Sequence, residues 1–119
     1  MNKISTLKDQ RAAGPRDLGR PRTSPDRTEA NFEAFQSVLK CKWMLSILDR
    51  ISGGVRRPGA LQRAVPELSK KVMYERLWRL EELGIVERIE VSVKPAEVHY
   101  VLTDYGRRFS SVLDDLRAI

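Results

Sequence analysis

Apolar residues recur at helical spacing through most of the chain. The stretch 44–51 follows the i, i+3, i+4, i+7 pattern of one helix face, with apolar side chains at Met44, Ile47, Leu48 and Ile51. The pattern changes to alternation after Gly84, where the runs IVERIEVSV and VHYVL are separated by the short loop KPAE. Two alternating runs around a Pro-containing loop predict a β-hairpin. The sequence therefore predicts a mainly α-helical domain with a small two-stranded sheet.

Residues 56–84 contain two helical segments separated by a turn at Pro66. Ser69 is predicted to be the N-cap of the second segment, because its hydroxyl can accept a hydrogen bond from a backbone amide of the first turn. Gly84 is predicted to end this helix. Between them lies an apolar stripe formed by Met73, Leu77, Leu80 and Leu83. The two segments predict a helix-turn-helix, with the hairpin directly after it as a wing.

Two further helices are predicted before this motif. Thr28 is expected to cap the first helix, whose apolar side chains are Phe32, Phe35, Val38 and Leu39. The segment 40–43 is expected to begin the next helix, with Trp43 in the core. Gly53 and Gly54 are expected to end it.

The remaining elements follow from local signals. The segment 55–57 predicts a short strand that pairs with the wing, and Gly59 is expected to cap a short helix over 60–65. Thr103 is expected to cap the last helix. That helix carries an apolar stripe of Tyr105, Phe109, Val112, Leu113 and Leu116.

Positive charge gathers in two parts of the chain. The net charge is +6, and residues 56–80 contain seven Lys or Arg against two acids. Residues 1–28 contain seven against three, whereas residues 81–119 contain five against eight. This distribution favours a polyanion such as nucleic acid as the partner.

Short matches to one known family occur in order between Lys42 and Ile119. They are Lys42-Trp43, Arg56-Arg57, Val65-Pro66, Leu68-Ser69, Arg76-Leu77, 80–86, 98–100, Leu102-Thr103 and Gly106-Arg107. Together they resemble the HxlR-type winged helix-turn-helix transcriptional regulators, relatives of the MarR group. The resemblance covers about two thirds of the chain. It implies a winged helix-turn-helix fold, DNA binding, and a dimer interface built from the N- and C-terminal helices.

The resemblance implies that the recognition helix, Ser69–Leu83, enters the major groove and that the wing contacts the backbone or minor groove. The residues predicted to lie near DNA are Arg56, Arg57, Ser69, Lys70, Lys71, Tyr74, Glu75, Arg76, Arg79 and Lys94. The lysines suit phosphates as point charges. Arg76 can bind one guanine through two hydrogen bonds, or a phosphate.

Among the departures from the family pattern, three bear directly on DNA binding. Tyr74 and Glu75 replace the commoner threonine and glutamine, so the operator preference of relatives does not carry over. Glu97 stands where many relatives have arginine, which predicts a weaker grip of the wing on DNA.

The first and last helices carry more large apolar residues than a short helix at the edge of a small domain needs. The residues predicted to form the dimer interface are Phe32, Phe35, Phe109, Val112, Leu113 and Leu116. Packing of each side chain onto its own domain stays an open alternative.

Residues 1–28 are poor in large apolar groups and rich in Arg, Pro, Gly, Ser and Asp. They are predicted to form a flexible basic arm, which leaves 29–119 as a single DNA-binding domain. The segment 19–22, Gly-Arg-Pro-Arg, resembles the core of an AT-hook, whose arginines lie in the minor groove of A·T-rich DNA. A merely solvated arm is the alternative.

The chain has one cysteine and one histidine. Cys41 lies between two lysines, surroundings that suit a redox-sensing thiol. Family members that sense oxidants carry their cysteine at the start of the first helix instead, so a structural role for Cys41 stays open. His99 is predicted to be a surface strand residue, with a pH switch as the alternative. One cysteine and one histidine in separate elements predict no metal site, no cofactor and no enzymatic activity.

The sequence thus predicts a homodimeric, sequence-specific transcriptional regulator that binds double-stranded DNA. It names no small-molecule or redox effector. No run approaches the roughly 18 apolar residues of a membrane span, so we expect a cytoplasmic protein without membrane contact. Two alternatives stay open: a winged-helix protein-interaction module that uses the acidic C-terminal region, and an architectural DNA binder of low specificity.

Overall fold

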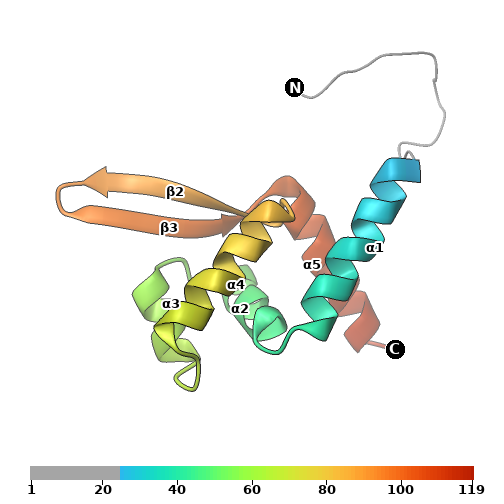
Figure 1. The fold of residues 1–119 in the computed structure, drawn as a ribbon, viewed down its shortest axis with the longest axis horizontal. Helices are drawn as coiled ribbons and strands as arrows, with labels where there is room; N and C mark the ends of the chain where they lie inside the picture. Colours follow the sequence, from blue (N-terminus) through green and yellow to red (C-terminus); the bar gives the residue numbers. More distant parts are fainter. Residues whose placement is uncertain (1–24) are drawn as a thin grey trace, which may run out of the picture. The chain divides into compact units, whose positions relative to one another are not determined.

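The computed structural model describes residues 25–119 (Figure 1). The elements are α1 (Pro25–Lys40), α2 (Met44–Ser52), α3 (Pro58–Ala64), α4 (Lys70–Glu82), β2 (Val86–Val93), β3 (Ala96–Leu102) and α5 (Asp104–Arg117). The chain divides into two units, Met1–Phe35 and Gln36–Ile119. The second unit contains the helix-turn-helix and the wing. This arrangement confirms the predicted mainly α-helical fold with a small sheet.

Helix α1 begins earlier than the sequence signal indicated. It starts at Pro25, so Thr28 lies inside the helix and the prediction that Thr28 caps it is wrong. Proline is favoured in the first turn of a helix because its fixed φ suits the helix and its missing amide would be unpaired there. The last residues of the predicted arm, 25–28, are therefore helical. The rest of the arm, with the AT-hook-like segment 19–22, lies outside the described residues.

A sharp turn separates α1 from α2. Trp43 has φ 85°, in the left-handed region, and precedes the first residue of α2, Met44. The prediction that 40–43 already belongs to this helix is wrong, because a left-handed residue cannot continue a right-handed helix. Trp43 is only half-buried, and the Lys42 ammonium lies 5.0 Å from its ring centroid. Helix α2 ends at Gly53, as predicted.

The core of the second unit forms around α2, which contacts α3, α4 and α5. Its predicted stripe is confirmed, because all four of its apolar residues are buried. The other elements contribute further buried apolar side chains to this core, including Leu61, Leu68, Met73, Leu77, Leu80 and Ile85. Burial of each such side chain stabilises the fold by about 1.5–3 kcal/mol relative to its exposed state. The packing of these side chains therefore holds the helices at a fixed angle to one another.

The helix-turn-helix consists of α3 and α4. Helix α3 begins at Pro58, with Arg57 as N-cap, rather than after Gly59 as predicted. The Ser69 hydroxyl accepts a hydrogen bond from the Val72 amide at 3.1 Å, which confirms Ser69 as the N-cap of α4. Gly84 has φ 77° just past the end of α4, the conformation that glycine adopts most readily.

Strands β2 and β3 form the antiparallel hairpin that the alternating pattern predicted, with Lys94 and Pro95 in its turn. Figure 1 shows the hairpin extending from the end of α4 and the start of α5 toward the side on which α3 lies, and α3 contacts β3. The predicted strand at 55–57 is wrong. That segment makes one backbone hydrogen bond to the wing, from the Tyr100 amide to the Arg56 carbonyl at 2.8 Å, and one bond does not make a strand.

Helix α5 is capped by Thr103, as predicted, whose hydroxyl accepts a hydrogen bond from the Gly106 amide at 2.9 Å. A Cβ at Gly106 would lie 1.9 Å from the Ile85 carbonyl oxygen, so only glycine permits this approach of α5 to the segment after α4. Phe109 and Leu113 are each 2% exposed. The start of α5 is thereby held against the core of the second unit.

Candidate nucleic-acid interface

The first turns of α4 present a polar and aromatic face to solvent. Met73, Leu77 and Leu80 are buried on one side of the helix. The opposite side is exposed and carries Lys70, Lys71, Tyr74, Glu75 and Trp78. We call these five residues the outward face of α4. Because a buried stripe fixes the rotation of a helix about its axis, the outward face is held in a constant orientation relative to the wing.

Arg76 and Arg79 lie on the flank of α4 rather than on its outward face. The Arg76 Nε atom is buried and has no hydrogen-bond partner. The Arg79 guanidinium donates to the Ser37 hydroxyl of α1 at 3.1 Å and to the Glu82 carboxylate at 3.3 Å. The structure therefore does not gather these two arginines with the lysines on the outward face.

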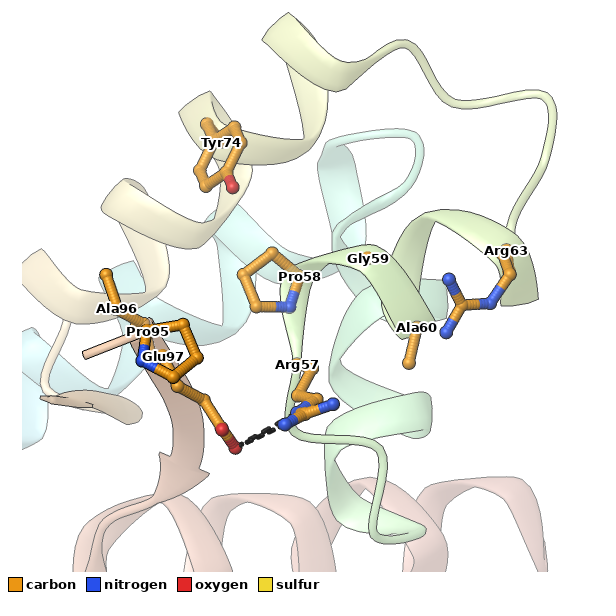
Figure 2. A pocket seen from close by; sticks show the side chains of 10 residues that line it. Arg57, Pro58, Gly59, Ala60, Arg63, Tyr74, Pro95, Ala96 and Glu97 are labelled. Carbon is orange, nitrogen blue, oxygen red and sulfur yellow. Dashed lines mark hydrogen bonds and ion pairs between the residues drawn. The ribbon is translucent and has the colours of Figure 1, made fainter. Parts of the chain in front are cut away.

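A groove of about 490 Å³ lies between the start of α3, the outward face of α4 and the wing. Its lining residues are Arg57, Pro58, Gly59, Ala60, Arg63, Tyr74, Pro95, Ala96, Glu97 and Val98. Figure 2 shows Arg57 and Glu97 joined across one side of this groove, with Tyr74 on α4 at another. The groove places the predicted DNA residues Arg57 and Tyr74 on one continuous concave surface.

Glu97 binds two partners through the same carboxylate oxygen. The Arg57 Nη2 atom lies 2.7 Å from Glu97 Oε2 and the Arg57 Nε atom donates to it at 3.1 Å. The His99 Nε2 atom lies 2.8 Å from the same oxygen. The hydrogen bond from Arg57, and then that with His99, hold the pKa of the Glu97 carboxyl below its ordinary value of 4.5.

The interaction between Glu97 and Arg57 is the feature of this surface that the sequence interpretation missed. The two residues are 40 positions apart. The only feature of the sequence that pointed to this interaction was the acid at position 97, where the family resemblance implied an arginine. Arg63, which also lines the groove, was counted as positive charge but was not predicted to be a site residue.

The other predicted DNA residues are Lys94 in the wing turn, Arg56 before α3 and Ser69 at the start of α4. Lys94 is exposed at the tip of the wing, next to Pro95. Arg56 is exposed just before α3, where its carbonyl holds β3. Ser69 is exposed, but its hydroxyl already caps α4.

The residues predicted for a dimer interface fall into two groups. Phe32, Val112 and Leu116 are 66%, 46% and 47% exposed. Phe109 and Leu113 are buried within the single chain and offer little surface to a partner, and Phe35 is half-buried. The exposed group is the part of the set that remains available for contact between subunits.

Cys41 is a free, half-buried cysteine in the turn between α1 and α2. Among residues 25–119, no group of three or more His, Cys, Asp or Glu side chains is placed to hold a metal ion. In the same part of the chain, none of the helices combines the length and the apolar character that crossing a membrane requires.

Comparison with known proteins gives consistent matches. A family model described as HxlR-like helix-turn-helix matches residues 38–119. The HTH-type transcriptional regulator YtcD of Bacillus subtilis (strain 168) is 35% identical over 88 residues, which cover 74% of this chain and 70% of that protein.

Solved structures agree with the sequence matches. The reduced form of the transcriptional regulator YodB from B. subtilis superposes with a TM-score of 0.66 at 29% identity, over 81% of this chain and 89% of that one. A MarR-family regulator from Enterococcus faecalis V583 superposes with a TM-score of 0.69, also at 29% identity, over 84% of this chain and 89% of that one.

Proposed function

The chain belongs to the HxlR-like helix-turn-helix family, whose matched relatives are transcriptional regulators, and we propose that it acts as a homodimer that binds a specific operator in duplex DNA. Helix-turn-helix regulators read DNA by placing the second helix of the motif in the major groove. Here that helix is α4. A DNA-binding regulator acts in the compartment that holds the DNA, so we propose a cytoplasmic location.

The observation that carries the proposal is the outward face of α4. Lys70 and Lys71 stand exposed at the first turn, beyond the Ser69 cap, where ammonium groups can reach phosphates at the groove edge. Tyr74 and Glu75 follow one turn later on the same face. A carboxylate accepts hydrogen bonds only, and the donors that base edges offer it in the major groove are the amino groups of cytosine N4 and adenine N6.

The positions of the two arginines on the flank of α4 suggest different roles. Arg79 already has partners on α1 and on its own helix, which favours a role in holding the recognition helix in place. Arg76 has a buried Nε, so only the end of its guanidinium can extend toward a phosphate. We therefore assign base contacts to Tyr74 and Glu75, and backbone contacts to the lysines, Arg76 and the wing residue Lys94.

The homodimer is supported by exposed apolar residues outside the helix-turn-helix. Phe32 on α1, and Val112 and Leu116 on α5, are each exposed by more than two fifths of their surface. Apolar surface of this kind is stabilised when a second copy covers it. Two copies would present two recognition helices, which predicts an operator with inverted-repeat symmetry.

The test is a titration of duplex DNA followed by fluorescence anisotropy at several salt concentrations. The probes are the DNA flanking the protein's own gene and a random duplex of equal length. We expect tighter binding to the flanking DNA, and a log–log salt slope of about −0.9 for each phosphate neutralised. The variant Lys70→Ala/Lys71→Ala should weaken binding to both probes and make the slope shallower by about 0.9 for each phosphate that the lysines no longer neutralise.

The control variant is Arg108→Ala, which removes an exposed cation on α5, outside the proposed surface. Its salt slope should match that of the unmodified protein. Equal affinity for both probes would indicate an architectural DNA binder, and a slope near zero would indicate a protein-interaction module.

A further inference from the structure

Arg57, one of the predicted DNA-contacting residues, forms an ion pair with Glu97 within the protein. Its guanidinium lies at the start of α3, the first helix of the helix-turn-helix, and donates to Glu97 on β3 of the wing. The pair thus links two elements that both belong to the proposed DNA surface. Figure 2 shows it at the side of the groove, with the carboxylate directed at the guanidinium.

The pair is open to solvent on one side. The Arg57 side chain is 60% exposed, whereas the Glu97 side chain is 27% exposed. Arg63 lines the same groove, and within the described residues Glu97 is the one acid in that lining. A negatively charged group entering the groove would therefore meet two guanidinium groups and a single carboxylate that already occupies one of them.

We propose that Glu97 is an internal competitor of DNA: it holds Arg57 in the free protein and yields it to a backbone phosphate when DNA binds. This inference rests on the proposed function. Because the competitor acts on each binding event, Glu97 would lower the affinity of the protein for every DNA sequence alike. It would thereby weaken binding to operator and to non-operator DNA by the same factor and leave the specificity ratio unchanged.

The exchange is physically reasonable because an exposed ion pair is weak. Solvent and salt screen the attraction between Arg57 and Glu97, and both side chains lose rotamer freedom when they pair. A phosphate presents oxygens in a geometry that a guanidinium fork can bind through two parallel hydrogen bonds. After the exchange Glu97 keeps its contact with His99, 2.8 Å away, so the carboxylate is not left without a partner.

Two mechanisms can make an acid oppose DNA binding, and they differ in one respect. A carboxylate can repel phosphates directly through space, and then its effect does not depend on Arg57. Alternatively it can occupy Arg57, as proposed, and then its effect disappears when Arg57 is removed. A double-mutant cycle separates the two mechanisms, because it measures the dependence of one substitution on the other.

The experiment compares the unmodified protein with Glu97→Gln, Arg57→Ala and the double variant, using a 30-base-pair duplex of mixed sequence as the probe. We expect Glu97→Gln to tighten binding about two- to fivefold, the range expected for release of an exposed ion pair. Its log–log salt slope should also steepen by about 0.9 for each additional phosphate neutralised. In the Arg57→Ala background, Glu97→Gln should change the affinity by less than half as much on a logarithmic scale.

The matched control is Glu90→Gln, which removes one negative charge from an exposed position on the other strand of the wing. It should leave the affinity within about twofold of the unmodified protein, as expected for a screened surface charge. Thermal unfolding followed by circular dichroism confirms that every variant is folded.

Four results would overturn the inference. Equal tightening by Glu97→Gln in both backgrounds would assign the effect to direct repulsion. Equal tightening by Glu90→Gln would assign it to net charge. No tightening by Glu97→Gln, in a protein that itself binds the duplex with a steep salt slope, would reject the competitor and leave the proposed function intact. Absence of duplex binding by the unmodified protein would reject both.

Discussion

Neighbouring basic residues on α4 have different surroundings, and this decides how much of each side chain is exposed to solvent. Lys71 is exposed on the outward face, whereas Arg76, five residues later, lies at the edge of the buried stripe with its Nε enclosed. The difference arises because five residues rotate a helix by about 140° beyond a full turn. Charge counted along the sequence therefore overstates the number of fully exposed cations on α4.

Arg76 provides a test of stability at the residue scale. Arg76→Met keeps a long apolar side chain and removes a buried polar atom that has no hydrogen-bond partner. Since an unpaired buried donor is unfavourable, the free energy of unfolding in urea should stay the same or rise. Arg79→Met is the matched variant, because it removes the bonds to Ser37 and Glu82 and should be less stable by about 0.5–1.5 kcal/mol. A larger decrease in stability for Arg76→Met than for Arg79→Met would contradict this assignment.

Cys41 provides a second test at this scale. It is half-buried in the turn between α1 and α2. If its role is structural, Cys41→Ser should bind DNA like the unmodified protein, and peroxide should affect both proteins equally. Anisotropy titrations before and after oxidation measure this. Release of the unmodified protein from DNA by peroxide, with the serine variant resistant, would make Cys41 a sensor.

At the scale of elements, two contacts hold the wing and the helix-turn-helix in a fixed arrangement. Backbone contact joins β3 to the segment before α3, through the Tyr100 amide and the Arg56 carbonyl. On the other side, α5 approaches the segment after α4 so closely that Gly106 touches the Ile85 carbonyl. These contacts set the position of the recognition helix relative to the wing tip.

Gly106→Ala should therefore destabilise the fold. The new methyl group would lie 1.9 Å from a backbone oxygen, which must move to admit it. Overpacking of this kind costs about 1–3 kcal/mol. The matched control is Gly59→Ala in α3, where the nearest atom is the end of the Arg63 side chain at 3.6 Å and alanine favours the helix. Urea unfolding should show a lower midpoint for Gly106→Ala alone, and equal midpoints would show that the backbone yields without cost.

At the scale of the whole molecule, the proposed dimer depends on residues that the single chain leaves exposed. Val112 and Leu116 are one helical turn apart on α5 and are exposed to similar extents. Phe109 and Leu113 lie on the buried side of the same helix. This division separates an interface function from a core function within one apolar stripe.

The two groups should respond differently to a charged substitution. Val112→Glu/Leu116→Glu places charges on exposed surface, so it should give monomers with unchanged circular dichroism. Phe109→Glu buries a carboxylate in the core of the single chain, so it should unfold the protein. Light scattering measures mass, and circular dichroism measures folding. A dimer that survives Val112→Glu/Leu116→Glu would place the interface elsewhere.

Much of this protein could be predicted from its sequence, because many of its signals are local. The caps at Ser69 and Thr103, the stop at Gly84 and the alternating runs of the wing depend on residues a few positions apart. Each therefore predicted its element correctly. The ordered family matches added the winged fold and the regulator family, which the comparisons confirm.

Tertiary structure decided the features that depend on distant residues. Whether Phe109 faces a partner or the core depends on how α5 packs, and the close approach at Gly106 sets that packing. The pairing of Arg57 with Glu97 needs two elements 40 residues apart to meet, and no periodicity encodes such a meeting. Spacing along a chain determines which residues share a face of one helix or strand. Which faces and ends then meet is decided by how all the elements bury their apolar surfaces at once.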